Sequence, residues 1–202
     1  MQILQTRQST ELRQAAIIAA VLELTAERSP ALITTNDIAL TMGLSQGAIF
    51  KHFPTKEAIW LAVMEWTQEQ LLTALESAAL EGTTALERLQ AVFMTHVHFV
   101  MEYPGVPRLI FNELQQPDDT PLKQHVRKLL QGYRKILARL LAAAEDAGEL
   151  AEELNQDAAA TLFIGTVQGL VMQSMLAGST KRMDAAARPV FRLYLQAIRR
   201  TS

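Results

Sequence analysis

The stretch TTNDIALTMGLSQGAIFKHF, from Thr34 to Phe53, constrains the fold of this chain more than any other segment. Hydroxyl residues open each half of it, and such side chains cap helices by accepting hydrogen bonds from free backbone amides. Between the halves lies Gly43, which can take the left-handed conformation of a sharp turn without steric cost. Ala39, Gly43 and Ile49 fall where crossing helices need a small contact, a tight turn and a buried branched residue. The spacing predicts a helix-turn-helix over 34–53, with helices at 35–42 and 46–52, although two ordinary helices joined by a glycine turn have similar spacing.

The sequence GAIFKHFPTKEAI resembles the recognition helix and the following helix start of the tetracycline-repressor (TetR) family of bacterial transcription regulators. The resemblance covers about residues 10–63. It rests on residues that occur in the family's order, namely Ile38-Ala39, Gly43-Leu44, Gly47, Phe50, His52-Phe53 and Lys56-Glu57. The chain departs from the family in having no aromatic residue near Thr25 and no glycine near Ser29. Beyond residue 63 the resemblance is one of architecture only.

The rest of the chain favours an all-α fold. With 49% hydrophobic and 20% charged residues, the 202-residue chain has an ordinary globular composition, and no alternating β-branched runs indicate strands. Together with the resemblance, this predicts a helix-turn-helix DNA-binding domain over 1–55 and an effector-binding and dimerisation domain over 56–202. A long helix over 55–80 would join them. Further helices are predicted from Thr10 to the Ser29-Pro30 break, from 84 to the break at 103–107, and over 108–115, 122–147 and 158–178, with a last helix starting near Pro189.

The resemblance implies that the second helix of the motif enters the major groove of an operator DNA. Gln46 is the best candidate for reading a base, because its amide can donate to and accept from adenine. Ser45, Lys51 and Lys56 would hold phosphates. The resemblance also implies contact positions at Thr35, Asn36, Gly47, Ala48, Phe50 and His52. Family members usually have tyrosine at Phe50, so a hydroxyl contact to phosphate is missing here, and Phe50 and His52 could instead serve packing.

Charge does not support strong nonspecific DNA binding by the first domain. Residues 1–60 contain five Lys or Arg and five Asp or Glu, and the whole chain has a formal net charge of -2. Phosphate neutralisation would therefore depend on a few local cations. A helical ligand-binding or adaptor protein that has lost DNA binding is the alternative that this neutrality leaves open.

The second domain is expected to bind a small-molecule effector that releases DNA, as in regulators of the family. Its apolar and aromatic residues provide candidates for the lining of a cavity, although for each of them a place in the core is the favoured interpretation. The candidates are Phe93, His96, Val97, Val100, Tyr103, Phe111, Tyr133, Phe163 and Val167.

The family resemblance implies a homodimer, and two apolar helices near the end of the chain favour one too. The stretch from Ala158 to Gly178 has no charge and is long enough to be mistaken for a membrane span, but its polar Gln and Thr residues favour a helix buried on nearly all sides. Such helices need covering, and pairing with their copies builds a four-helix interface, although an intrachain core is the alternative. The predicted interface residues are Gly165, Gly169, Met172, Phe191, Leu195 and Ile198. A dimer would place two recognition helices about 34 to 36 Å apart.

Several classes of function receive no support from the sequence. There is no cysteine, which excludes disulfides and cysteine-ligated metals, and His96 and His98 point to opposite sides of a helix, so no metal site is predicted. No nucleophile elbow, phosphate-binding glycine loop or acid pair indicates an enzyme, and no cofactor is expected. The first nine residues lack the pattern of a signal peptide, so we expect a cytoplasmic protein without a membrane segment.

Overall fold

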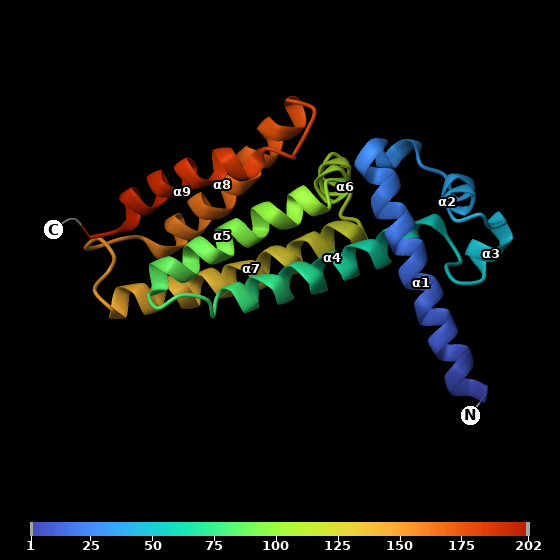
Figure 1. Cartoon of the computed structure of the whole chain (residues 1–202), viewed down its shortest axis with the longest axis horizontal. Helices are drawn as coiled ribbons and strands as arrows, with labels where there is room; N and C mark the ends of the chain where they lie inside the picture. Colours follow the sequence, from blue (N-terminus) through green and yellow to red (C-terminus); the bar gives the residue numbers. More distant parts are fainter. Residues whose placement is uncertain (1, 201–202) are drawn as a thin grey trace. The chain divides into compact units, whose positions relative to one another are not determined.

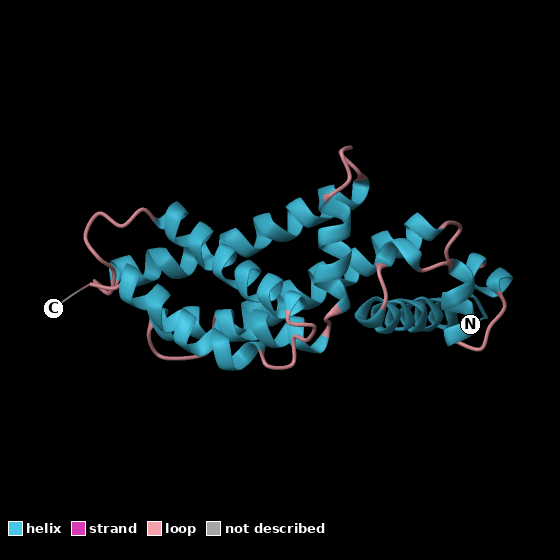
Figure 2. Cartoon of the chain, turned by 90° about the horizontal axis from the view of Figure 1, so that it is seen from above, coloured by secondary structure: helices cyan, strands magenta, loops and turns pink. Residues whose placement is uncertain are grey.

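The computed structural model describes the backbone of residues 2–200 and the side chains of residues 10–200 (Figures 1 and 2). Throughout this part of the chain the structure is helical, without a β-strand, which confirms the all-α prediction. A short 3-10 turn, η1 (Pro30–Leu32), separates the first two helices. The helices are α1 (Gln2–Glu27), α2 (Thr35–Thr41), α3 (Gln46–Phe50), α4 (Lys56–Ala78), α5 (Ala85–Glu102), α6 (Gly105–Leu114), α7 (Pro121–Asp146), α8 (Gln156–Leu176) and α9 (Met183–Ile198).

The chain divides into two compact units, and α4 and α7 each run through both. The first unit comprises residues up to Gln68 together with Tyr103–Arg127, and the second comprises Glu69–Glu102 together with the chain from Lys128 onward. The predicted first domain, residues 1–55, thus lies inside a unit that also takes in the start of α4 and all of α6.

In the first unit, α1 packs against α2 and α6 (Figure 1). The contact with α6 is so close that a Cβ atom added to Gly105 would lie 2.8 Å from Thr25 Cβ and 2.9 Å from the Leu22 carbonyl oxygen. Around this contact the core contains Ile17 and Val21 of α1, both fully buried. Glycine at position 105 is therefore required by the packing of α6 on α1.

In the second unit, α5, α8 and α9 pack on one another (Figure 1), and a cluster of aromatic rings lies between them. Phe163 of α8 is central to it, with ring centroids 5.3 Å from Phe93 of α5 and 5.4 Å from Tyr194 of α9. Tyr133 of α7 and Phe191 of α9 complete the cluster. Such edge-to-face pairs stabilise a core beyond the apolar area that they bury.

Three helix starts differ from those predicted by three or more residues. Helix α1 begins at Gln2 and not at Thr10, since the intervening residues contain no glycine or proline to prevent a helix. Helix α6 begins at Gly105, because Pro107 lies in its first turn, where a backbone donor is not needed. The predicted start of α9 at Pro189 is wrong, since the helix begins at Met183 and contains the proline. The buried residues Met183 and Ala187 extend its apolar stripe across the proline.

The prediction that the helix at 158–178 is buried on nearly all sides is also wrong for the single chain. Helix α8 has a mean hydropathy of 1.4 and is, by length and composition, the helix of the described residues that could cross a membrane. Only 39% of its 18-residue apolar window is buried within the chain, and Leu162, Met172 and Leu176 are 50%, 45% and 81% exposed. One side of α8 belongs to the aromatic core and the other is an uncovered apolar face.

Candidate nucleic-acid interface

The start of α2 is fixed by a capping box. The Thr34 hydroxyl accepts a hydrogen bond from the Asp37 amide at 3.1 Å, and the Asp37 carboxylate accepts from the Thr34 amide at 2.7 Å. Arg28, just after α1, donates to Asp37 at 3.0 Å. The hydroxyl and amide of Thr34, followed by Arg28, lower the pKa of Asp37 to about 2. The pattern Thr-x-x-Asp could have revealed this cap in the sequence, whereas the contribution of Arg28 requires the fold.

The turn between α2 and α3 has the predicted form. Gly43 has φ of +63°, and the Leu44 amide closes the turn by donating to the Ala39 carbonyl at 2.8 Å. Ser45 then caps α3, accepting from the Ala48 amide at 3.3 Å. Ala39 and Ile49 are buried where the two helices meet. Helix α3 ends at Phe50, two residues before its predicted end.

The N-terminal side of α3 is open to solvent. Of the predicted contact residues, those that lie exposed are Asn36, Ser45, Gln46, Gly47, Phe50 and Lys51. Those that are partly buried are Ala48, His52 and Lys56. Phe50 is 42% exposed and so is not primarily a packing residue, whereas Thr35 is only 8% exposed and offers little surface to DNA.

Two of the predicted contact residues bond to each other. Gln46 and Thr35 are the first residues of α3 and α2, and Gln46 Nε2 donates to Thr35 Oγ1 at 2.6 Å. The predicted base-reading side chain is thus attached to a buried hydroxyl of the neighbouring helix. Sequence reasoning missed this bond, because the two residues are eleven positions apart and belong to different helices.

His52 and Lys56 also have neighbours within the first unit. The His52 carbonyl accepts a hydrogen bond from Gln14 Nε2 at 3.2 Å, which fixes the end of the motif to α1. Lys56 Nζ lies 5.7 Å from the centre of the Trp60 ring, in a cation–π arrangement. Lys51 is exposed and is not in such a cation–π arrangement among the described residues, so its ammonium group is more available to a phosphate than that of Lys56.

The residues predicted to line an effector cavity are divided between the two units. Tyr103 and Phe111 belong to the first unit, where the Tyr103 ring packs edge-on against Trp66 at 4.9 Å. The other predicted lining residues belong to the second unit, where Phe93, Tyr133 and Phe163 fill the aromatic core. His96 Nδ1 lies 3.2 Å from the Tyr133 hydroxyl, and burial lowers the pKa of His96 to about 4.

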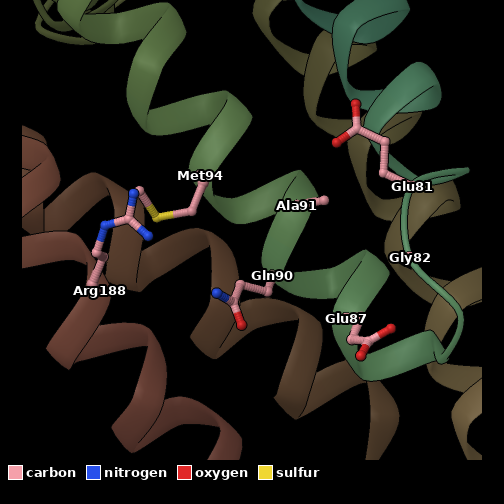
Figure 3. Close-up of a pocket in the computed structure, with 7 residues that line it drawn as sticks. All are labelled: Glu81, Gly82, Glu87, Gln90, Ala91, Met94 and Arg188. Carbon is pink, nitrogen blue, oxygen red and sulfur yellow. The ribbon is translucent and has the colours of Figure 1, made fainter.

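Two cavities of the second unit lie away from these predicted residues. One, of about 380 Å³, is bounded by α5, the preceding loop and α9, with Arg188 beside Met94 (Figure 3). Its Glu87 carboxylate is already engaged by the Thr83 and Thr84 amides at the start of α5. The other, of about 520 Å³, is lined by Leu86, Gly148, Glu149, Arg199 and Arg200. Neither has the apolar lining that was expected of an effector cavity.

The predicted interface residues fall into two groups. Phe191 and Ile198 are 2% and 1% exposed and pack inside their own chain, so they cannot belong to an outer face. Gly165 and Met172 lie exposed on α8, and a Cβ atom added to Gly165 or Gly169 would have nothing within 4 Å. Leu195 is partly buried.

The uncovered apolar positions on α8 and α9 repeat every three or four residues. We call them the α8/α9 seam, which consists of the exposed Ala158, Leu162, Gly165, Met172 and Leu176 on α8 and Ala186, Leu193 and Ala197 on α9, together with the partly buried Gly169 and Val190. A spacing of alternating three and four is that of helices packing side by side with a nearly parallel partner. Sequence reasoning missed the whole α9 part, because it assigned the stripe of Phe191, Leu195 and Ile198 to the interface.

Comparison with known proteins places both parts of the chain in one family. The family described as "Bacterial regulatory proteins, tetR family" matches residues 17–63, and "Tetracyclin repressor-like, C-terminal domain" matches residues 85–190, more than half of the chain. The fatty acid metabolism regulator protein of Bacillus subtilis is 26% identical over 182 residues, which are 90% of this chain and 93% of that protein. The nucleoid occlusion factor SlmA of Actinobacillus pleuropneumoniae is 27% identical over 109 residues, so the chain spans about half (54%) of that relative's length.

Solved structures agree with this assignment. The regulator FadR from Bacillus subtilis, in complex with stearoyl-CoA, has a TM-score of 0.79 and 26% identity over 91% of this chain and 98% of its own. A TetR transcription regulator from Haloarcula marismortui has a TM-score of 0.81 at 17% identity over 94% of this chain and all of its own, which shows the fold alone. The matching families consist of regulators and not enzymes. The chain belongs to the tetracycline-repressor (TetR) family of bacterial transcription regulators.

Proposed function

We propose that this protein is a cytoplasmic transcriptional repressor that binds a palindromic operator as a homodimer and leaves it when a small-molecule effector binds. The observation that carries the proposal is the exposed N-terminal face of α3, held by a capped helix-turn-helix in a chain of the TetR family. The functional division into a DNA-binding domain over 1–55 and an effector-binding and dimerisation domain over 56–202 is part of this proposal.

The DNA-binding face would read bases through Gln46 and contact phosphates through Lys51. Both side chains are exposed, and Ser45 and Gly47 beside them allow the backbone to approach the groove. We expect Gln46→Ala and Lys51→Ala to weaken binding to DNA upstream of the protein's own gene, as measured by fluorescence anisotropy at two salt concentrations. Gln131→Ala and Lys135→Ala remove the same side chains from the exposed surface of α7 and serve as matched controls.

The α8/α9 seam supports the homodimer. Its side chains are apolar and most of them are exposed, with Leu176 at 81% and Leu193 at 65%. A second copy would cover both strips at once in a four-helix arrangement, because a twofold axis brings identical surfaces together. The small Gly165 and Gly169 would allow the two copies of α8 to approach closely.

The effector that we favour is a long-chain acyl-CoA. The support is the similarity over most of the chain to the Bacillus subtilis regulator whose structure contains stearoyl-CoA. The aromatic core of the second unit also contains a buried polar group, the Tyr194 hydroxyl, that has no hydrogen-bond partner among the described residues. A buried hydroxyl without a hydrogen bond costs about 1 to 3 kcal/mol, which an effector atom could recover.

The effector is tested by titrating the protein–DNA complex with stearoyl-CoA, with stearate and with coenzyme A. We expect release of DNA by stearoyl-CoA at concentrations where the two fragments are inactive. Tyr194→Phe should respond more weakly to stearoyl-CoA while unfolding at a higher temperature, because the unpartnered hydroxyl is removed. Release by none of the three compounds would contradict an acyl-CoA effector without affecting the proposal of DNA binding.

A helical adaptor protein that does not bind DNA is the second candidate. The equal numbers of cationic and acidic residues in positions 1–60 favour it, because most nonspecific DNA affinity comes from neutralised phosphates. Failure to bind genomic DNA fragments even at low salt would favour the adaptor, whereas binding that weakens as salt is raised supports the repressor.

A further inference from the structure

The side chain that the proposed function assigns to base reading, Gln46, is hydrogen-bonded to Thr35. A glutamine reads adenine by donating an N–H to N7 and accepting from N6 with its carbonyl oxygen. A free glutamine amide can rotate and offer other combinations of donor and acceptor. In this protein, Gln46 Nε2 donates to Thr35 Oγ1 at 2.6 Å, so the amide is held at one end.

The bond leaves part of the amide free. A primary amide has two N–H groups and one carbonyl oxygen, and Thr35 occupies one N–H. One donor and one acceptor remain on Gln46, which is exposed to solvent. That pair complements the N7 acceptor and N6 donor of adenine and not the two acceptors that guanine presents.

The Thr35 hydroxyl is itself fixed by its surroundings. Thr35 is 8% exposed and is the first residue of α2, directly after the capping residue Thr34. The capping box of Thr34 and Asp37, and the hydrogen bond from Arg28 to Asp37, tie this helix start to the end of α1. A side chain bonded to such a rigid point loses less entropy on binding than a free one.

We propose that Thr35 is a positioning residue, which does not itself touch DNA but orients the Gln46 amide so that it selects adenine at one position of each operator half-site. This inference rests on the proposed DNA-binding function. It differs from the contact role that the family resemblance implies for Thr35, because the hydroxyl acts here through Gln46.

The test compares base preferences of full-length variants. Selection of DNA ligands from a random pool with the wild-type protein defines the operator, and Gln46→Ala identifies the position whose preference depends on Gln46. Thr35→Val, which keeps the shape but removes the hydroxyl, should lower the adenine preference at that position about 2- to 10-fold, the effect of losing one hydrogen bond. Thr35→Ser keeps the hydroxyl and should retain the preference.

Controls separate this role from a general weakening of the motif. Thr41→Val makes the same change on the same helix at an exposed hydroxyl that bonds the Asp37 carbonyl, and should leave the preference unchanged. In a Gln46→Ala background, Thr35→Val should have no further effect on the preference. If thermal unfolding shows that Thr35→Val is misfolded, Thr35→Ala provides the second variant without the hydroxyl.

The outcomes are distinguishable. A wild-type adenine preference in a folded Thr35 variant without the hydroxyl, or no change of preference at any position in Gln46→Ala, would overturn the inference while DNA binding stands. Absence of DNA binding by the wild-type protein would overturn the proposed function and this inference together.

Discussion

Gly105 at the start of α6 and Gly165 on α8 are both helical glycines, but their surroundings are opposite. A Cβ atom at Gly105 would lie 2.9 Å from the Leu22 carbonyl oxygen and still closer to the Thr25 side chain. At Gly165 it would meet nothing within 4 Å. A glycine inside a helix costs about 1 kcal/mol relative to alanine, so each needs a reason.

The two glycines represent two kinds of contact. Gly105 lies at a contact between helices of the same chain, whereas Gly165 lies on a surface that the described chain leaves uncovered. At Gly105 the neighbouring helix α1 belongs to the same compact unit and leaves no room for a side chain. At Gly165 and Gly169 none of the described residues would lie within 4 Å of an added Cβ atom, although the two positions continue an apolar seam with Leu162 and Met172. The close approach that these glycines permit requires a second molecule, which we propose to be a copy of the chain.

The largest effect is expected from a charge in the α8/α9 seam. Met172→Arg would bury an uncompensated cation in the proposed interface, at a cost of about 3 to 5 kcal/mol, so that dimer dissociation should increase by at least about 100-fold. Sedimentation equilibrium measures the change. Leu80→Arg introduces the same charge at a leucine that is 79% exposed and lies outside α8 and α9, and should leave the dimer intact. An unchanged dimer in Met172→Arg would remove the proposed reason for Gly165 and Gly169.

A smaller effect is expected at the contact that the chain completes. Gly105→Ala forces α6 away from α1 and should lower the free energy of unfolding by about 1 to 3 kcal/mol, as overpacking does. Urea denaturation followed by circular dichroism measures it. Gly165→Ala is the matched control, because its methyl group meets open space within the chain and should not destabilise the monomeric fold. Equal stability of Gly105→Ala and the wild-type protein would show that α6 adjusts without loss.

The helix-turn-helix was predictable because local interactions define it. The α8/α9 seam was not, because local interactions do not determine which surface covers a hydrophobic face. Gly43, Ser45 and Ile49 specify a turn, a cap and a buried position through interactions within a few residues. Periodicity likewise grouped Phe191 and Ile198 correctly on one buried stripe. It could not tell that this stripe faces the same chain, because a hydrophobic face does not identify its neighbour.

Contacts between segments distant in sequence were the part that could not be predicted. The bond between Gln46 and Thr35 depends on how α2 and α3 cross, and the close contact of Gly105 with Thr25 joins residues eighty positions apart. Pro189 inside α9 is a further case, since the local rule that proline breaks a helix is overridden by the burial of Met183 and Ala187 before it.

The inner side of α8 differs from the exposed seam on the same helix, because on the inner side the chain completes its own packing, as it does at Gly105. Phe163 contacts Tyr133, whose hydroxyl lies 3.2 Å from His96 Nδ1. Burial lowers the pKa of His96 to about 4, from 6.5 in the unfolded chain. Between these values the unfolded state binds more protons, so the free energy of unfolding should fall as the pH is lowered from 6.5 to 4, by an amount on the order of 1 to 3 kcal/mol.

Urea denaturation at a series of pH values tests this expectation. His96→Gln should reduce the slope between pH 6.5 and 4, since the glutamine cannot take up the proton. His98→Gln removes an exposed histidine two residues further along α5 and should leave the slope unchanged. The carboxyls of Asp37 and Glu87, whose pKa values the fold lowers, also contribute near the acid end of this window, but they are the same in all three proteins and their contribution cancels in the comparison. The same slope in His96→Gln and the wild-type protein would mean that His96 is protonated without disturbing the core, and that the inner side of α8 is less tightly packed than its aromatic contacts indicate.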